Sequence, residues 1–105
     1  MVFLKEYEKL YIKAKEDFVA ATYLLDGYNN HGLELNLEII FFHFQQSAEK
    51  LIKSLLDYNG VKFSYIHDIE KLISILDKNN IYVECDIKKL IDLTGYAVEG
   101  LDYEN

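Results

Sequence analysis

Apolar residues recur every three or four positions along two long stretches of this sequence, and no proline interrupts either of them. The first stretch runs from about Lys5 to Tyr28 and the second from roughly Glu34 to Tyr58. This spacing places side chains on one face of an α-helix, whereas a half-buried strand needs strict alternation. Each stretch therefore predicts one long amphipathic helix. The residues expected to point inward are Tyr7, Leu10, Tyr11, Ala14, Phe18, Ala21, Leu25 and Tyr28 in the first helix, and Leu37, Phe41, Phe44, Ala48, Leu51, Leu55 and Tyr58 in the second.

Two shorter helices are predicted after Asn59 and Gly60, which end the second stretch. One begins near His67 and Asp68, because an aspartate suits the exposed amides and the positive dipole of a first helical turn. Its expected buried face consists of Ile69, Leu72, Ile73 and Leu76. The other is marked by Ile87, Leu90, Ile91, Thr94, Ala97, Val98 and Leu101.

The length of 105 residues suits a single domain over residues 1–105 and is too short for two. Half of the residues are apolar and only 5 are glycine, which favours helices over a turn-rich β fold. The predicted fold class is all-α. Its expected architecture is an antiparallel up-and-down four-helix bundle, with the first two helices long and the last two shorter.

The charged residues of the chain indicate which classes of binding partner are not expected. The net charge is -7, and all 11 basic residues are lysines, so the planar guanidinium that clamps phosphates at two points is missing. Non-specific nucleic-acid binding is not expected, because lysine and arginine charges supply most of that affinity. The single cysteine, Cys85, cannot form an internal disulfide, and no apolar run is long enough to span a bilayer. We therefore expect a cytoplasmic protein with no membrane association.

Metal, cofactor and nucleophile signatures are absent from the sequence. None of the three histidines follows a glutamate at the three-residue spacing that di-metal helical bundles use. Cys85 has no histidine nearby in the sequence, and no run has the glycines of a phosphate-binding loop. The sequence thus predicts no metal, no cofactor and no catalytic residue.

A stripe of polar residues on the second helix is the remaining candidate site, formed by His43, Gln46, Glu49 or Lys50, and Lys53. Positions 43, 46 and 50 share one face of a helix. On the first helix Asp17 falls where the repeat predicts an apolar residue, so it should face another helix and need a partner such as Lys50 or His43. From the residues alone, a hydrogen-bonded network that fixes helix packing is favoured over a ligand site.

Four segments, in this order, resemble the HEPN domain family: KAKEDFVAATYLL, FHFQQSAEKLIKSLL, HDIEKLISIL and LTGYAVEG. The resemblance implies an antiparallel four-helix bundle that is often a homodimer. It also implies a minimal nucleotidyltransferase as a partner in a toxin-antitoxin pair, and a polar groove that binds a nucleotide or another phosphorylated ligand. The matched groove positions are Asp17, His43, Gln46, Lys50, His67 and Asp68.

The ribonuclease branch of that family uses an Arg-x4-6-His motif, and this sequence has no arginine. The ending LTGYAVEGLDYEN also departs from the family, which has an Arg-Tyr pair followed by proline at that point. We therefore expect a non-enzymatic nucleotide- or partner-binding module. Two alternatives stay open: a metal-independent ribonuclease with His43 or His67 as general acid or base, and a purely structural dimerisation domain rich in tyrosine.

Overall fold

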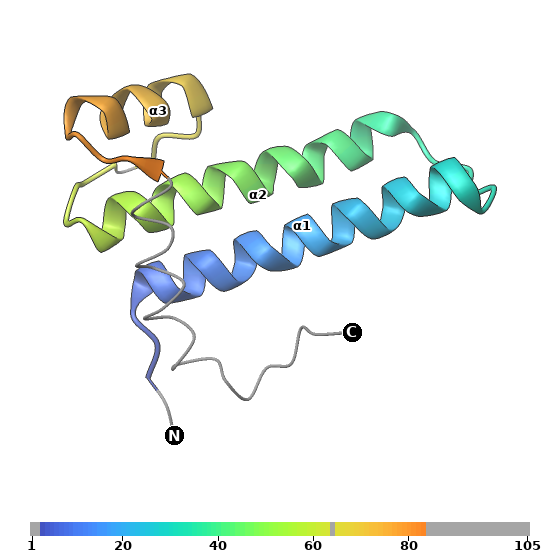
Figure 1. Ribbon diagram of the computed structural model, residues 1–105, viewed down its shortest axis with the longest axis horizontal. Helices are drawn as coiled ribbons and strands as arrows, with labels where there is room; N and C mark the ends of the chain where they lie inside the picture. Colours follow the sequence, from blue (N-terminus) through green and yellow to red (C-terminus); the bar gives the residue numbers. More distant parts are fainter. Residues whose placement is uncertain (1–2, 64, 84–105) are drawn as a thin grey trace.

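The computed structural model describes residues 3–63 and 65–83 of the chain, and this part forms α-helices without strands. Its helices are α1 (Glu6–Asn30), α2 (Leu37–Tyr58) and α3 (Ile69–Lys78). In Figure 1, α1 and α2 form a long antiparallel hairpin, and α3 lies against the C-terminal half of α2. The all-α class is confirmed. Three helices are present in this part instead of four, and the predicted fourth helix, over 87–101, lies outside the described residues.

Polar side chains fix where α2 and α3 begin. The Oδ1 atom of Asn36 accepts a hydrogen bond from the amide of Glu38 at 3.0 Å, so α2 starts at Leu37 and not at Glu34 as predicted. Asp68 accepts from the amides of Glu70 and Lys71 at 2.9 and 3.4 Å. The predicted start of the third helix is therefore confirmed.

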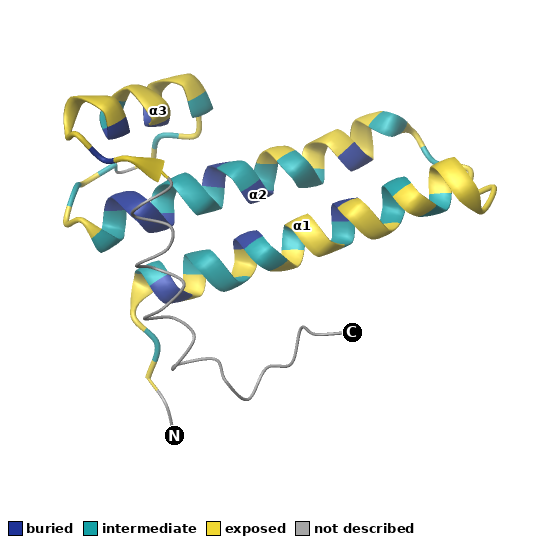
Figure 2. Cartoon of the chain, viewed as in Figure 1, coloured by how far each residue is buried: buried dark blue, intermediate teal, exposed yellow. Residues whose placement is uncertain are grey.

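The hydrophobic core lies at one end of the hairpin, between the C-terminal part of α2, α3 and the segment that follows α3. Its buried members are Leu55, Leu56, Leu72, Leu76 and Ile81. Tyr7 and Tyr11 of α1 pack against this cluster, and the rings of Tyr7 and Tyr58 meet edge to face at 5.2 Å. Figure 2 shows the same concentration of buried residues where α2 and α3 meet.

The rest of the hairpin is held together mainly by small residues. Ala14 and Ala21 are buried against α2, and the hydroxyl of Ser47 donates to the carbonyl oxygen of Ala14 at 2.7 Å. Ile40 is the large apolar residue that is fully buried in this half. Small side chains let the helix backbones approach closely, so larger neighbours are displaced to the flanks of the contact.

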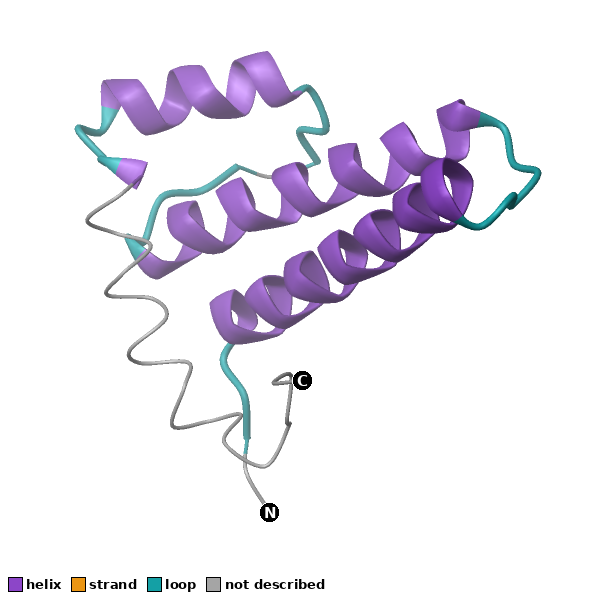
Figure 3. Cartoon of the chain, turned by 45° about the vertical axis from the view of Figure 1, so that its right-hand side comes forward, coloured by secondary structure: helices purple, strands orange, loops and turns teal. Residues whose placement is uncertain are grey.

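Four of the predicted inward residues are instead exposed. Phe18 and Phe41 have 53% and 61% of their surface accessible, and Tyr28 has 40%. Ile73 of α3 is 51% exposed, because α3 turns Leu72 and Leu76 toward α2. In Figure 3, α3 lies on the side of α2 away from α1, so α2 is in the middle of the three helices.

Candidate functional site

Asp17 of α1 meets two residues of α2 that are two helical turns apart. The Nζ atom of Lys50 donates to Oδ2 of Asp17 at 2.6 Å, and Nδ1 of His43 lies 3.7 Å from the other oxygen, Oδ1. The side chains of Asp17, Lys50 and His43 are 19%, 28% and 32% exposed. We call these three residues the Asp17 cluster. The prediction that Asp17 would have a partner on the second helix is confirmed by its bond with Lys50.

His43 has an unusual environment within this cluster. Its Nδ1 atom is buried without a hydrogen-bond partner in the described part of the chain, since 3.7 Å is too long for a hydrogen bond to Asp17. The rest of the side chain reaches solvent, and its ring meets Phe42 edge to face at 5.8 Å. His43 Nδ1 is therefore a buried polar atom that the described contacts leave without a hydrogen bond.

A second charged group lies between α2 and the connector that leads into α3. Glu49 accepts from Nζ of Lys53 at 2.9 Å, and its Oε2 atom lies 3.0 Å from Nδ1 of His67. The side chains of Glu49 and Lys53 are 9% and 12% exposed, while that of His67 is 73% exposed. We call these residues the Glu49 cluster.

The electrostatics of Glu49 combine two opposing effects. Burial raises the pKa of the Glu49 carboxyl, but the hydrogen bonds and charges of His67 and Lys53 act in the opposite direction and prevail. The pKa of Glu49 is therefore below its ordinary value of 4.5. This carboxylate stays charged although it is almost inaccessible to water.

The six groove residues expected from the sequence lie in different surroundings. Asp17, His43 and Lys50 come together. Gln46 is half-buried on the same face of α2, and no hydrogen bond of its side chain occurs among residues 3–63 and 65–83. His67 belongs instead to the Glu49 cluster, and Asp68 caps α3.

The sequence leaves Glu49 and Lys50 as alternatives on one stripe, whereas the structure assigns them to separate clusters. Adjacent residues of a helix point about 100° apart, so Lys50 reaches α1 and Glu49 reaches the connector before α3. The spacing of Glu49 and Lys53, four residues apart with the acid first, is the signal in the sequence for the second cluster.

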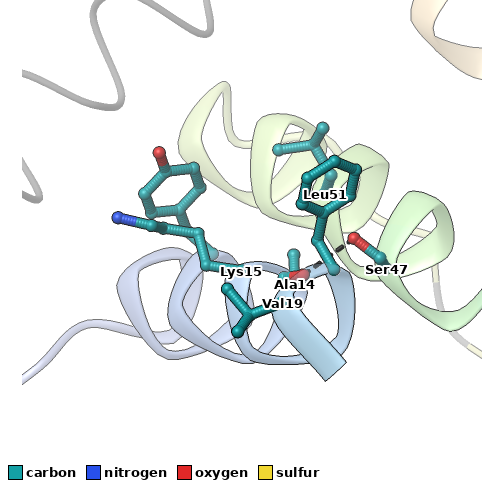
Figure 4. Close-up of a pocket in the computed structure, with 7 residues that line it drawn as sticks. Ala14, Lys15, Val19, Ser47 and Leu51 are labelled. Carbon is teal, nitrogen blue, oxygen red and sulfur yellow. Dashed lines mark hydrogen bonds between the residues drawn. The ribbon is translucent and has the colours of Figure 1, made fainter. Parts of the chain in front are cut away.

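An apolar groove lies on the other flank of the α1–α2 contact and was not predicted. Figure 4 shows it between α1 and α2, with the hydrogen bond from Ser47 to Ala14 at its floor. Its volume is about 240 Å³. The lining residues are Tyr11, Ala14, Lys15, Phe18, Val19, Ser47 and Leu51.

The described part of the chain holds no metal-binding group and no membrane span. No group of three or more histidine, cysteine, aspartate or glutamate side chains in residues 3–63 and 65–83 is arranged to hold a metal ion. In the same residues, none of the helices has both the length and the apolar character needed to cross a membrane.

Comparison with known proteins identifies the family. Searches against curated proteins and against solved structures returned no match. A family model described as the HEPN domain matches residues 7–104, which is nearly the whole chain. The match spans α2, α3 and all but the first residue of α1, together with both charged clusters, and it agrees with the resemblance found in the sequence. The chain belongs to the HEPN domain family.

Proposed function

We propose that this HEPN domain is a non-enzymatic module that binds a nucleotide or another phosphorylated ligand at the Asp17 cluster. In this proposal it acts as a homodimer and as one component of a toxin-antitoxin pair with a nucleotidyltransferase-type partner. The main support for the ligand site is the difference in solvent exposure among the three side chains. Asp17 is less exposed than Lys50 or His43, so a ligand arriving from solvent meets two basic groups before the acid.

The donors of the cluster suit a single phosphate group. An ammonium group has three N–H donors, and Asp17 accepts from one donor of Lys50, so donors remain for a ligand oxygen. A protonated His43 adds a second positive charge, and the half-buried amide of Gln46 supplies a neutral donor on the same helix face. Asp17 holds the ammonium group of Lys50 in place. A chain with a net charge of -7 tolerates one bound phosphate better than a long polyanion.

A nuclear magnetic resonance titration with adenosine monophosphate tests this site. Backbone amide shifts are expected at residues 43–50, and they should saturate in the millimolar range or below. Gln46→Ala should weaken binding several-fold without a change in melting temperature, because its side chain makes no bond in the described structure. Gln45→Ala, at the neighbouring exposed position, is the matched control. An unchanged spectrum at millimolar nucleotide would refute the proposal.

One observation favours a second candidate function, metal-independent RNA cleavage. A carboxylate that accepts from one nitrogen of an imidazole orients the ring and leaves the other nitrogen available as a general base. His67 has this relationship to Glu49, and its ring is 73% exposed. The lack of arginine in the sequence places this function second, since lysine does not reproduce the bidentate support of a phosphoryl-transfer transition state.

Incubation of the purified protein with RNA in the presence of a chelator separates the two candidates. Cleavage that His67→Ala abolishes and His43→Ala leaves intact would favour the ribonuclease. Cleavage that survives both substitutions belongs to a contaminant. No cleavage removes the ribonuclease, and the nucleotide titration then decides whether the site binds a ligand.

A further inference from the structure

An exposed aromatic side chain lies beside the Asp17 cluster and has no role in the site described above. Phe42 directly precedes His43 in α2, and 55% of its surface is accessible. The centres of the Phe42 and His43 rings are 5.8 Å apart, and the rings meet edge to face with 73° between their planes. The imidazole of the cluster is therefore in contact with a phenyl ring that is open to solvent.

A short series of contacts connects this ring with the basic groups of the cluster. One carboxylate oxygen of Asp17 lies 2.6 Å from Nζ of Lys50, and the other lies 3.7 Å from Nδ1 of His43. Because both groups approach the same carboxylate, they lie close together although their residues are two turns apart in α2. The ammonium group, the imidazole and the phenyl ring of Phe42 are thus neighbours in that order.

The positions on the helix agree with these contacts. Each residue of an α-helix advances by about 100°, so Phe42 lies about 40° from Gln46, the half-buried residue of the same site. Ile39 is one turn before Phe42 and is 44% exposed. This flank of α2 is therefore apolar near the start of the helix, at Ile39 and Phe42, and polar further along, from His43 to Lys50.

The ring of Phe42 has a face available for another flat group. The edge-to-face contact with His43 occupies at most one side of the phenyl ring, and more than half of the residue is accessible. Covering exposed apolar surface is favourable in water. A nucleobase covers such a ring with its own flat face, and this stacking contributes to affinity whatever the base, since every base has a π face.

The order of the groups on α2 matches the order of the groups in a 5′-mononucleotide, in which one ribose separates the phosphate from the base. A phosphate bound by Lys50 and His43 can direct the ribose toward either end of α2. Toward the start of the helix, the base reaches the open ring of Phe42. Toward the other end, it reaches the Glu49 cluster, whose charges already pair with one another. The first direction is therefore favoured.

We propose that the ring of Phe42 is the platform on which the base of a 5′-mononucleotide stacks when its phosphate is held at the Asp17 cluster. The inference rests on the proposed function, and it narrows the ligand from any phosphorylated compound to one that carries a flat aromatic base. Phe42 contributes to affinity through the base, whereas Lys50 and His43 contribute through the phosphate.

Two ligands with the same phosphate group separate these contributions. Adenosine monophosphate carries a base and ribose 5-phosphate does not, so the nucleotide should bind the unchanged protein about fivefold more tightly or better. Phe42→Ala should weaken binding of the nucleotide by about fivefold or more and change binding of ribose 5-phosphate by less than about twofold. Nuclear magnetic resonance titrations measure both affinities on each protein.

Phe41→Ala is the matched control. Phe41 is adjacent to Phe42 and is 61% exposed, but it lies about 160° from His43, on the other side of α2. Its truncation should leave both affinities unchanged. The quantity compared is the ratio of the two affinities within one variant. A variant that is only partly folded lowers both affinities together, so misfolding cannot imitate the expected result.

Fluorescence gives an independent readout of stacking. The chain contains no tryptophan, so Phe42→Trp introduces a single indole ring. A base stacked on this ring quenches its emission, and adenosine monophosphate should do so with a saturating dependence on concentration. Ribose 5-phosphate should leave the emission unchanged. In Phe41→Trp, neither ligand should give saturable quenching.

Three outcomes would overturn the inference. Equal affinities of the unchanged protein for the nucleotide and ribose 5-phosphate would leave a phosphate site without a base platform. Equal losses of nucleotide affinity in Phe41→Ala and Phe42→Ala would show an effect that is not specific to this flank of α2. Binding of neither ligand would refute the proposed function and this inference together. Because ribose 5-phosphate reports on the Asp17 cluster without a base, failure of the platform alone is distinguishable from failure of the site.

Discussion

The Nζ atom of Lys50 lies 2.6 Å from Oδ2 of Asp17, and this bond joins α1 to α2 between residues 33 positions apart in the sequence. Both side chains are partly shielded from solvent, so the pair is stronger than a fully exposed ion pair and requires both partners. The contact therefore has a structural role whether or not a ligand binds beside it.

Replacement of Lys50 by methionine should lower the free energy of unfolding by roughly 1–2 kcal/mol, because the partly buried carboxylate of Asp17 would lose its hydrogen-bond donor. The double variant D17L/K50M should lose less than the two single variants added together. Urea denaturation followed by circular dichroism measures these values. Lys13→Met, which removes an exposed lysine of α1, is the control and should change stability by less than about 0.5 kcal/mol.

Acid should destabilise the protein through Glu49. The pKa of this carboxyl is lowered in the folded state, so its contribution to stability is fully present above the unfolded-state value near 4.5. That contribution is lost as the pH falls through the folded-state pKa. Glu49→Gln should flatten the dependence of unfolding free energy on pH below about 4.5, whereas the exposed Glu38→Gln should not. Equal slopes for both variants would contradict the role assigned to His67 and Lys53.

Two adjacent residues of α3 should respond very differently to truncation. Leu72 is fully buried in the core, and Leu72→Ala should cost about 2–5 kcal/mol through lost apolar contact and the cavity left behind. Ile73 is 51% exposed, and Ile73→Ala should cost less than about 1 kcal/mol. Comparable losses in thermal or urea denaturation would mean that α3 packs with a different face toward α2.

Two substitutions of Asp68 distinguish a role in capping α3 from a role in binding the ligand. Asp68→Ala should destabilise α3 by about 0.5–2 kcal/mol, because the amides of Glu70 and Lys71 lose their acceptor. Asp68→Ser keeps a capping oxygen without the charge and should restore most of the stability. If nucleotide affinity follows stability in both variants, Asp68 acts on the site only through the helix. A serine variant that regains stability but not affinity would indicate direct contact between Asp68 and the ligand.

The parts of this structure that sequence predicts well are those that depend on local chemistry. The two long helices follow from apolar spacing, and the role of Asp68 follows because capping requires only the next few residues. Asp17 stands out because a charge in an apolar repeat needs a partner, and Lys50 provides one. Such inferences need no knowledge of how the helices are arranged.

Features that depend on how much of a helix face is covered by the neighbouring helix could not be predicted from the sequence. The apolar face of α1 is wider than its contact with α2, so periodicity placed Phe18 inward although it lies on the flank, where its ring meets Phe44 at 5.8 Å. In the same way, the repeat does not decide between Glu49 and Lys50. The position of His67 beside Glu49 depends on the path of a connector, which the sequence does not specify.

Glu49 and Lys50 are adjacent in α2 but contact different neighbours. Residues therefore cannot be inserted into this part of α2, or deleted from it, without loss of one of these contacts. One residue inserted just before Glu49 would turn one part of α2 by about 100° relative to the other, so the contacts with α1 and with α3 could not both be kept. Insertions and deletions between related chains should therefore fall in the loops that flank α2, at residues 31–36 and 59–68, and not within the helix. An alignment that places a gap inside residues 43–56 would misplace either the Asp17 cluster or the Glu49 cluster.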